Sequence, residues 1–237
     1  MIYKQVLKIL ITIISFSTIF ISCDTTQTNN GNFTLSFGSP NSLQKTTADT
    51  LQLTEVKILL RDIKLEHESA PKVTGGDHDG EGDEVVINVG PVVVHLNLTG
   101  MTTDFLISDI PAGTYNEIKF TIDKPDFSEI PPDPEFVDNQ DSTKRYSVIV
   151  KGMYNFVSFD YKSHKSAQQK LKFDQPLVIE DNTTTNLTIT VDPYTWFYDE
   201  GSLLDPNDLN NMYEIDHNIS RSFSNAFRDD NHDCKGD

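Results

Sequence analysis

Apolar and polar residues alternate along most of the chain beyond residue 32, which is the pattern of strands that bury one face. The first such segment carries Phe33, Leu35 and Phe37 on one side and ends at Gly38-Ser39-Pro40. Further segments of this kind are Ile118–Ile122, Tyr146–Val150, Tyr154–Phe159, Leu171–Phe173 and Leu187–Val191. The valine-rich stretches Val85–Val89, Val92–Val94 and Leu96–Leu98 give one or two more strands, split by Gly90-Pro91. About eight or nine strands in one chain predict an all-β domain made of two packed sheets.

The longest periodic segment, Leu51–Leu65, has two interpretations. Its apolar positions shift register at Arg61-Asp62, since one side carries Val56, Ile58 and Leu60 and then, out of phase, Ile63 and Leu65. Such a shift indicates a β-bulge or a short turn between two strands. The leucines and lysines of the segment also tolerate a helix. We favour a strand because the neighbouring segments all alternate.

A proline-glycine turn precedes the strand that begins near Tyr115, in the sequence Ile110-Pro111-Ala112-Gly113-Thr114-Tyr115. In Greek-key sandwiches a tyrosine at such a position helps to fix the corner. The stretch resembles a family of uncharacterised bacterial lipoprotein domains, in which a strand like Leu53–Glu66 is followed by an I-P-x-G-x-Y turn. The resemblance covers roughly Phe33–Ile122, and it implies an immunoglobulin-like or transthyretin-like two-sheet sandwich without implying a ligand.

The end of the chain has a helical period instead. Asp205-Pro206 suits the start of a helix. Apolar residues then recur at steps of three and four, at Leu209, Met212, Ile215, Ile219, Phe223 and Ala226. This pattern predicts a C-terminal amphipathic helix that packs on one sheet or closes one end of the sandwich.

The first residues have the parts of a secretion signal. Lys4 and Lys8 precede an apolar run from Ile9, and the run ends at Phe20-Ile21-Ser22-Cys23. These four residues resemble the lipobox of bacterial lipoproteins, which implies cleavage before Cys23 and acylation of that residue. An uncleaved membrane helix is disfavoured because the run is shorter than the roughly 20 residues of a bilayer span. A plain secreted protein is the other alternative.

The chain therefore divides into five predicted parts: a signal peptide (1–22), a flexible tether (23–31), a sandwich domain (32–195), a helical segment (196–228) and an acidic terminal loop (229–237). Within the sandwich, residues 123–143 are rich in proline and acid and predict a long exposed loop. The localisation that follows is the bacterial cell envelope, with Cys23 as the attachment to the membrane.

Charge narrows the range of partners. The chain has 19 basic and 36 acidic residues and a net charge of −17, which disfavours nucleic acid and anionic membrane surfaces. Cys23 and Cys234 are the two cysteines, so lipidation of Cys23 would leave no disulfide within the mature chain. A cation, an envelope protein or a glycan is then a reasonable partner.

Two acidic stretches could hold a metal ion. Asp229, Asn231 and Asp233, with Asp237 behind, resemble the short calcium loops of EF-hand, dockerin and thrombospondin type 3 modules, whose alternate oxygens converge on Ca²⁺. Cys234 stands where those loops have glycine, and a frayed terminus without an ion is the favoured interpretation. In the second stretch, Asp77, His78 and Asp79 could hold zinc or copper, but interleaved glycines favour a solvated hairpin loop.

Two further observations concern function. The aromatic residues Tyr194, Trp196, Phe197 and Tyr198 could stack on sugar rings, although packing against the helix is favoured. The chain has no G-x-S-x-G, H-E-x-x-H, P-loop or dinucleotide-binding sequence. We therefore expect a lipid-anchored, non-enzymatic binding or structural module, with a metal-binding protein or a carbohydrate-binding accessory protein as alternatives.

Overall fold

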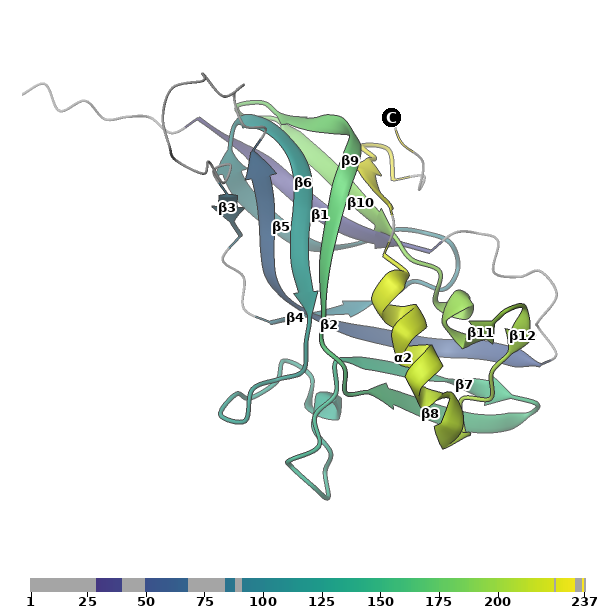
Figure 1. Cartoon of the computed structure of the whole chain (residues 1–237). Coiled ribbons are helices and arrows are strands. Elements are labelled where there is room, and N and C mark those ends of the chain that lie inside the picture. The colour runs from purple at the N-terminus through teal and green to yellow at the C-terminus, as the bar shows by residue number, and fades with distance from the viewer. Residues whose placement is uncertain are drawn as a thin grey trace, which may run out of the picture.

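Two β-sheets pack face to face in the computed structural model, which describes residues 29–39, 50–67, 84–87, 91–223, 225–232 and 236. The smaller sheet has the order β13-β10-β1-β5, made of Asn225–Arg228, Thr184–Thr190, Asn30–Gly38 and Thr103–Pro111. Within it β1 is parallel to β10, and its other pairs are antiparallel. The fold is the all-β, sandwich-like arrangement that the alternating pattern predicts (Figure 1).

The larger sheet is built on one long strand, β2 (Leu51–His67). Its order is β8-β7-β2-β6-β9, made of Val157–Ser163, Val148–Tyr154, β2, Gly113–Ile122 and Ala167–Ile179. The first half of β2 pairs with β7 and the second half with β6, so both lie along one edge of β2. The other edge pairs with β4 (Val92–His95) and β3 (Glu84–Val86). The loop between β6 and β7 therefore starts and ends beside the middle of β2.

A β-bulge interrupts β2 where the apolar pattern shifts. The pairing with β6 changes register between Arg61 and Lys64, and Asp62 has φ of 53°. Ile63 and Leu65 are fully buried beyond the bulge. The strand interpretation of this segment is confirmed, as one strand with a bulge rather than two strands.

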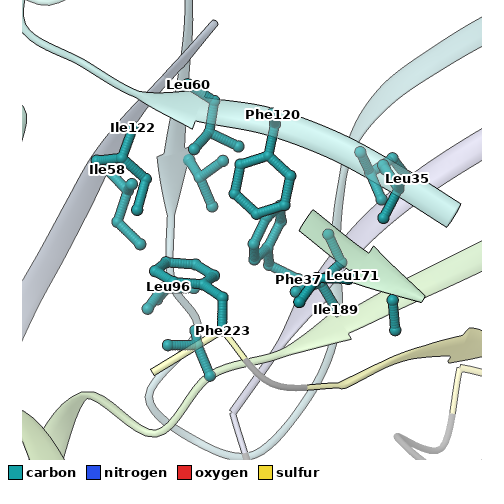
Figure 2. Close-up of a cluster of buried hydrophobic side chains, with 14 of the residues drawn as sticks. Leu35, Phe37, Ile58, Leu60, Leu96, Phe120, Ile122, Leu171, Ile189 and Phe223 are labelled. Carbon is teal, nitrogen blue, oxygen red and sulfur yellow. The ribbon is translucent and has the colours of Figure 1, made fainter. Parts of the chain in front are cut away.

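The core lies between the two sheets and continues under the C-terminal helix. Figure 2 shows side chains from β1, β2, β6, β9 and β10 pointing toward one another, and the labelled ones are Leu35, Phe37, Ile58, Leu60, Leu96, Phe120, Ile122, Leu171, Ile189 and Phe223. Phe37, Phe120 and Phe223 contact one another edge to face at centroid distances of 5.7–6.3 Å. This arrangement joins the smaller sheet, the larger sheet and the segment after the helix.

The tyrosine corner is present. Tyr115 is fully buried, and its hydroxyl donates to the carbonyl oxygen of Pro111 at 2.7 Å. The His67 ring lies 4.4 Å from the Tyr115 ring, between centroids. A Cβ at Gly113 would come within 2.3 Å of that imidazole, so a larger residue here would push the His67 ring off Tyr115.

Replacing Tyr115 with phenylalanine should lower the free energy of unfolding by about 1 kcal/mol, because it removes the hydrogen bond from the buried Tyr115 ring to the Pro111 carbonyl. Urea denaturation followed by circular dichroism measures this change. Tyr213→Phe is the matched control, since Tyr213 is 74% exposed, and it should leave the urea midpoint unchanged. Equal midpoints for the two variants would contradict a stabilising role of the corner.

The C-terminal helix is shorter than its periodic stretch. Helix α2 covers Met212–Arg221, after the 3-10 turn η4 (Leu209–Asn211), and the chain then re-enters the smaller sheet as β13. Ile215 and Ile219 are buried as the pattern predicts, whereas Leu209 is 78% exposed and Ala226 lies on β13. Within the described residues, no helix has both the length and the apolar character needed to cross a bilayer.

Candidate functional site

The structure describes only some of the candidate site residues that the sequence indicates. Outside the described residues lie Cys23, Asp77, His78, Asp79, Asp233 and Asp237. Asp229 and Asn231, from the calcium-loop pattern, are described. In the described part of the chain, no three histidine, cysteine or acidic side chains are grouped in a way that could hold a metal ion.

The described start of the acidic terminus packs against the smaller sheet. Asp229 is fully buried, and its backbone N–H donates to the Asn186 carbonyl at 3.1 Å. The Asp230 carboxylate accepts from the Asn186 N–H at 3.1 Å and from Arg228 Nε at 2.6 Å. Residues 229–230 therefore continue the pairing of β13 with β10 rather than fraying.

The aromatic residues after β10 are mainly core. Trp196 and Phe197, in the 3-10 turn η3 (Pro193–Phe197), are fully buried. Phe197 contacts Phe159 and Tyr161 of β8 at centroid distances of 5.7 and 6.0 Å. Trp196 and Phe197 therefore cover the β7–β8 half of the larger sheet. Because both are fully buried, they are not available to stack on a sugar.

The proline-rich segment after β6 is mostly exposed or partly exposed, as its composition predicts, but it is also anchored to the larger sheet. Residues 123–147, hereafter the β6–β7 loop, fold back on the outer face of β2 and β7. Phe136 of the 3-10 turn η2 (Pro134–Phe136) is fully buried and Tyr146 is 6% exposed. With Leu59 and Ile149 they form a second small core on that outer face.

A network of charged groups holds the same loop. Lys57 Nζ lies 2.7 Å from carboxylate oxygens of both Asp133 and Glu135, and Lys151 Nζ lies 2.7 Å from Glu55 and 2.8 Å from Glu135. Hydrogen bonds from Lys151 and Lys57 lower the pKa of Glu135 to about 2. Burial opposes the charge on Lys57, but hydrogen bonds from its two carboxylate partners raise its pKa overall.

Two arginines shape the first part of the loop. Arg145 is 8% exposed and donates to the carbonyl oxygens of Phe127 and Glu129, at 3.0 and 3.4 Å. Arg61 of β2 pairs with the Glu129 carboxylate. The Arg145 guanidinium also lies 5.3 Å from the centroid of the Phe127 ring. The loop nevertheless presents Phe127 and Ile130 to solvent, with 76% and 92% of their surface exposed.

Among the cavities in the described part of the chain, one lies on the larger sheet and another lies at the β6–β7 loop. The larger, about 450 Å³, is on β2, β6 and β9 and is lined by Asp62, Lys64, Lys119, Phe120, Thr121, Gln168, Gln169 and Lys170. The smaller, about 200 Å³, is at the loop itself and is lined by Asp123, Lys124, Pro125, Asp126, Phe127, Thr143, Arg145 and His164. The larger cavity is the strongest candidate for a binding site, and the sequence pattern did not indicate it.

Comparisons with known proteins give no relative. No family model, no curated protein and no solved structure matches this chain.

Proposed function

We propose that the chain is a lipid-anchored protein of the bacterial cell envelope whose β-sandwich acts as a non-enzymatic binding or structural module. The observation that carries the proposal is Phe20-Ile21-Ser22-Cys23 at the end of an apolar run behind two lysines. Cys23 would carry the acyl chains, and stable anchoring takes more than one chain because each buried methylene contributes about 0.8 kcal/mol. The sandwich topology is compatible with the lipoprotein domain family that the Pro111–Gly113 turn resembles.

An anchor at Cys23 would also set the orientation of the sandwich on the membrane. Six residue steps separate Cys23 from Asn29, and an extended chain spans at most about 3.5 Å per residue, or about 20 Å. The end of the sandwich where Asn30 pairs with Pro111 would then lie next to the membrane. Strand β6 runs from that end for 10 residues, about 30 Å, to the β6–β7 loop (Figure 1). The loop would therefore face away from the bilayer.

Labelled palmitate tests the anchor. The full chain, expressed in a bacterial host, should incorporate the label and sediment with membranes, and Cys23→Ala should remove the label and release the protein. Cys234→Ala is the matched control, because it removes the other cysteine and should keep both properties. Label that survives Cys23→Ala, or label lost equally in Cys234→Ala, would contradict the proposal.

Calcium binding is the second candidate, favoured by one observation. The backbone N–H of Asp229 donates to Asn186 beside the end of β10, so the start of the predicted calcium loop has a fixed position. The Asp229 side chain is fully buried, and Asn231 is the exposed residue of the loop pattern within the described part of the chain. Calorimetric titration with Ca²⁺, compared between the native chain and Asn231→Ala, separates the two functions. Heats of binding that weaken in the variant support an ion site, and heats that are absent or identical exclude it.

A further inference from the structure

Strand β8 forms one edge of the larger sheet (Figure 1). It pairs with β7 on one side, and within the described residues no strand pairs with its other side. An open edge of this kind presents backbone N–H and C=O groups that can pair with a strand of another chain. The strand is seven residues long, an ordinary length for a strand in a sheet, so it could take part in a complete pairing.

The hairpin turn before β8 decides which of its backbone groups point outward. The turn Asn155-Phe156 has two residues, both with positive φ, and Tyr154 opposes Val157 across it. The pair that closes such a turn is hydrogen-bonded, and bonded and non-bonded pairs then alternate along the two strands. Every second residue of β8 after Val157 therefore turns its N–H and C=O away from β7. These residues are Ser158, Asp160 and Lys162.

Two of these three residues carry opposite charges. Asp160 and Lys162 lie on the same face of the strand, with 3.1 Å between a carboxylate oxygen and the ammonium nitrogen. Each charge thus has a partner within the chain, and the edge does not lack a counter-ion. What the two charges add is selectivity, because opposite charges in directly opposed positions stabilise a strand pair and like charges destabilise it.

A second copy of β8 satisfies this selectivity in one antiparallel register. When Tyr161 of one copy opposes Tyr161 of the other, Asp160 opposes Lys162 twice across the two-fold axis. Both of these pairs use the outward backbone groups, so they are hydrogen-bonded pairs. The register in which Asp160 opposes Asp160 also uses outward groups, but it sets like charges against each other. Charge therefore distinguishes between the two registers.

The same register brings together exposed apolar side chains from the two ends of β8. Phe156 and Val157, at its start, are both exposed. His164 directly follows its end and lines the 200 Å³ cavity together with Phe127, whose ring is also exposed. Because the two copies run antiparallel, the start of one β8 lies beside the end of the other. Each hairpin turn would then lie next to the cavity of the other copy, where apolar surface can be buried.

We propose that β8 is a self-association edge, at which two copies of this chain join their larger sheets through reciprocal pairs of Asp160 with Lys162. Charged residues on an edge strand can also serve to block such pairing. A block does not require an opposite charge two residues away, whereas the antiparallel join does. The inference goes beyond the proposed function, since it names a second copy as the partner, and it does not depend on lipidation of Cys23.

Sedimentation equilibrium of the full chain in detergent micelles tests the join, because micelles leave the two anchors free to take any direction. The native chain should dimerise reversibly as its concentration is raised. Asp160→Lys and Lys162→Asp should each weaken the dimer at least about tenfold, since each sets two like-charge pairs across the join. The variant with both exchanges should regain the native affinity, because opposite charges face each other again in the same register.

Asp174→Lys is the matched control for the charge exchange. Asp174 is exposed on β9, the strand at the opposite end of the larger sheet, and its replacement changes the net charge by the same amount. It should alter the dimer affinity by less than about twofold. Circular dichroism of every variant should match the native chain, which separates lost association from lost folding.

Disulfide trapping tests the register itself, in a chain that also carries Cys234→Ala. A mixture of Asp160→Cys and Lys162→Cys chains should give a cross-linked dimer. Opposed residues of a hydrogen-bonded antiparallel pair have Cα atoms about 5.5 Å apart, within the range of about 4.4–6.8 Å for a disulfide. Asp160→Cys alone should cross-link much less, because its two copies are not opposed in this register.

Four results would overturn the inference. These are a native chain that stays monomeric at every concentration, a dimer that Asp160→Lys leaves intact, a double exchange that fails to restore the dimer, or more cross-linking by Asp160→Cys alone than by the mixture. Failure of the anchor would appear in palmitate labelling and not in these measurements.

Discussion

Replacing Lys57 with methionine should lower the free energy of unfolding by about 2–3 kcal/mol, because it removes the cation that the β6–β7 loop is folded around. The side chain is 9% exposed and lies 2.7 Å from both Asp133 and Glu135. Breaking a buried ion pair costs about 3–5 kcal/mol, and the lower figure allows for the partial exposure of these carboxylates. Lys151 remains to neutralise Glu135 and Glu55.

The same variant should respond less to acid than the native chain. The folded pKa of Glu135 is about 2, below its ordinary value of 4.5. A lowered carboxyl pKa contributes stability that is complete above about pH 4.5 and is lost as the pH falls toward about 2. Lys57→Met removes one of the two ammonium groups that lower this pKa, so less stability is left to lose.

Urea titrations at about pH 6 and about pH 3 measure both effects. Lys144→Met is the matched control, since Lys144 is 59% exposed and its ammonium is 4.0 Å from Asp141. It should change the free energy of unfolding by less than about 0.5 kcal/mol at either pH. If Lys57→Met and Lys144→Met had the same urea midpoints, the ion network would not be what holds the loop.

Features that depend on neighbouring residues were predictable from the sequence. Alternation located β1, and the phase shift at Arg61-Asp62 located the bulge of β2, because both follow from the two-residue period of a strand. The corner at Tyr115 was also predictable, since the turn and the hydrogen bond to Pro111 lie within five residues. Each of these features is set by residues within a few positions of one another, which is the range over which a periodic pattern can be read.

Features that depend on pairing between distant segments were not predictable. Lys64, Lys119 and Lys170 are more than 50 residues apart in sequence, and only the strand register places them in one row. The β6–β7 loop has two buried aromatic residues among its acids, Phe136 and Tyr146, but the cation that attracts it, Lys57, belongs to another strand. The strand predicted over Tyr154–Phe159 was wrong at Phe156. This residue lies in the turn between β7 and β8, with φ of 66° and 82% of its surface exposed.

Trp196→Ala should destabilise the domain by about 3–5 kcal/mol, the range for removing a large aromatic side chain from a core. Trp196 is fully buried in η3, beside Phe197, and Asn218 of α2 donates to its carbonyl oxygen at 3.1 Å. The indole therefore lies where α2 covers the β7–β8 half of the larger sheet. The destabilisation should be largest in the β7–β8 half of the larger sheet, because the smaller sheet does not cover that half.

This prediction also separates core packing from a carbohydrate platform. Thermal unfolding followed by circular dichroism should show a large drop in midpoint for Trp196→Ala and almost none for Tyr213→Ala, whose ring is 74% exposed. Hydrogen exchange should show protection lost first in β8, where Phe159 and Tyr161 contact Phe197, and retained in β1 and β10. A glycan platform predicts the reverse, lost sugar binding at unchanged stability, and the full burial of Trp196 argues against that result because a ring stacked on sugar must reach solvent.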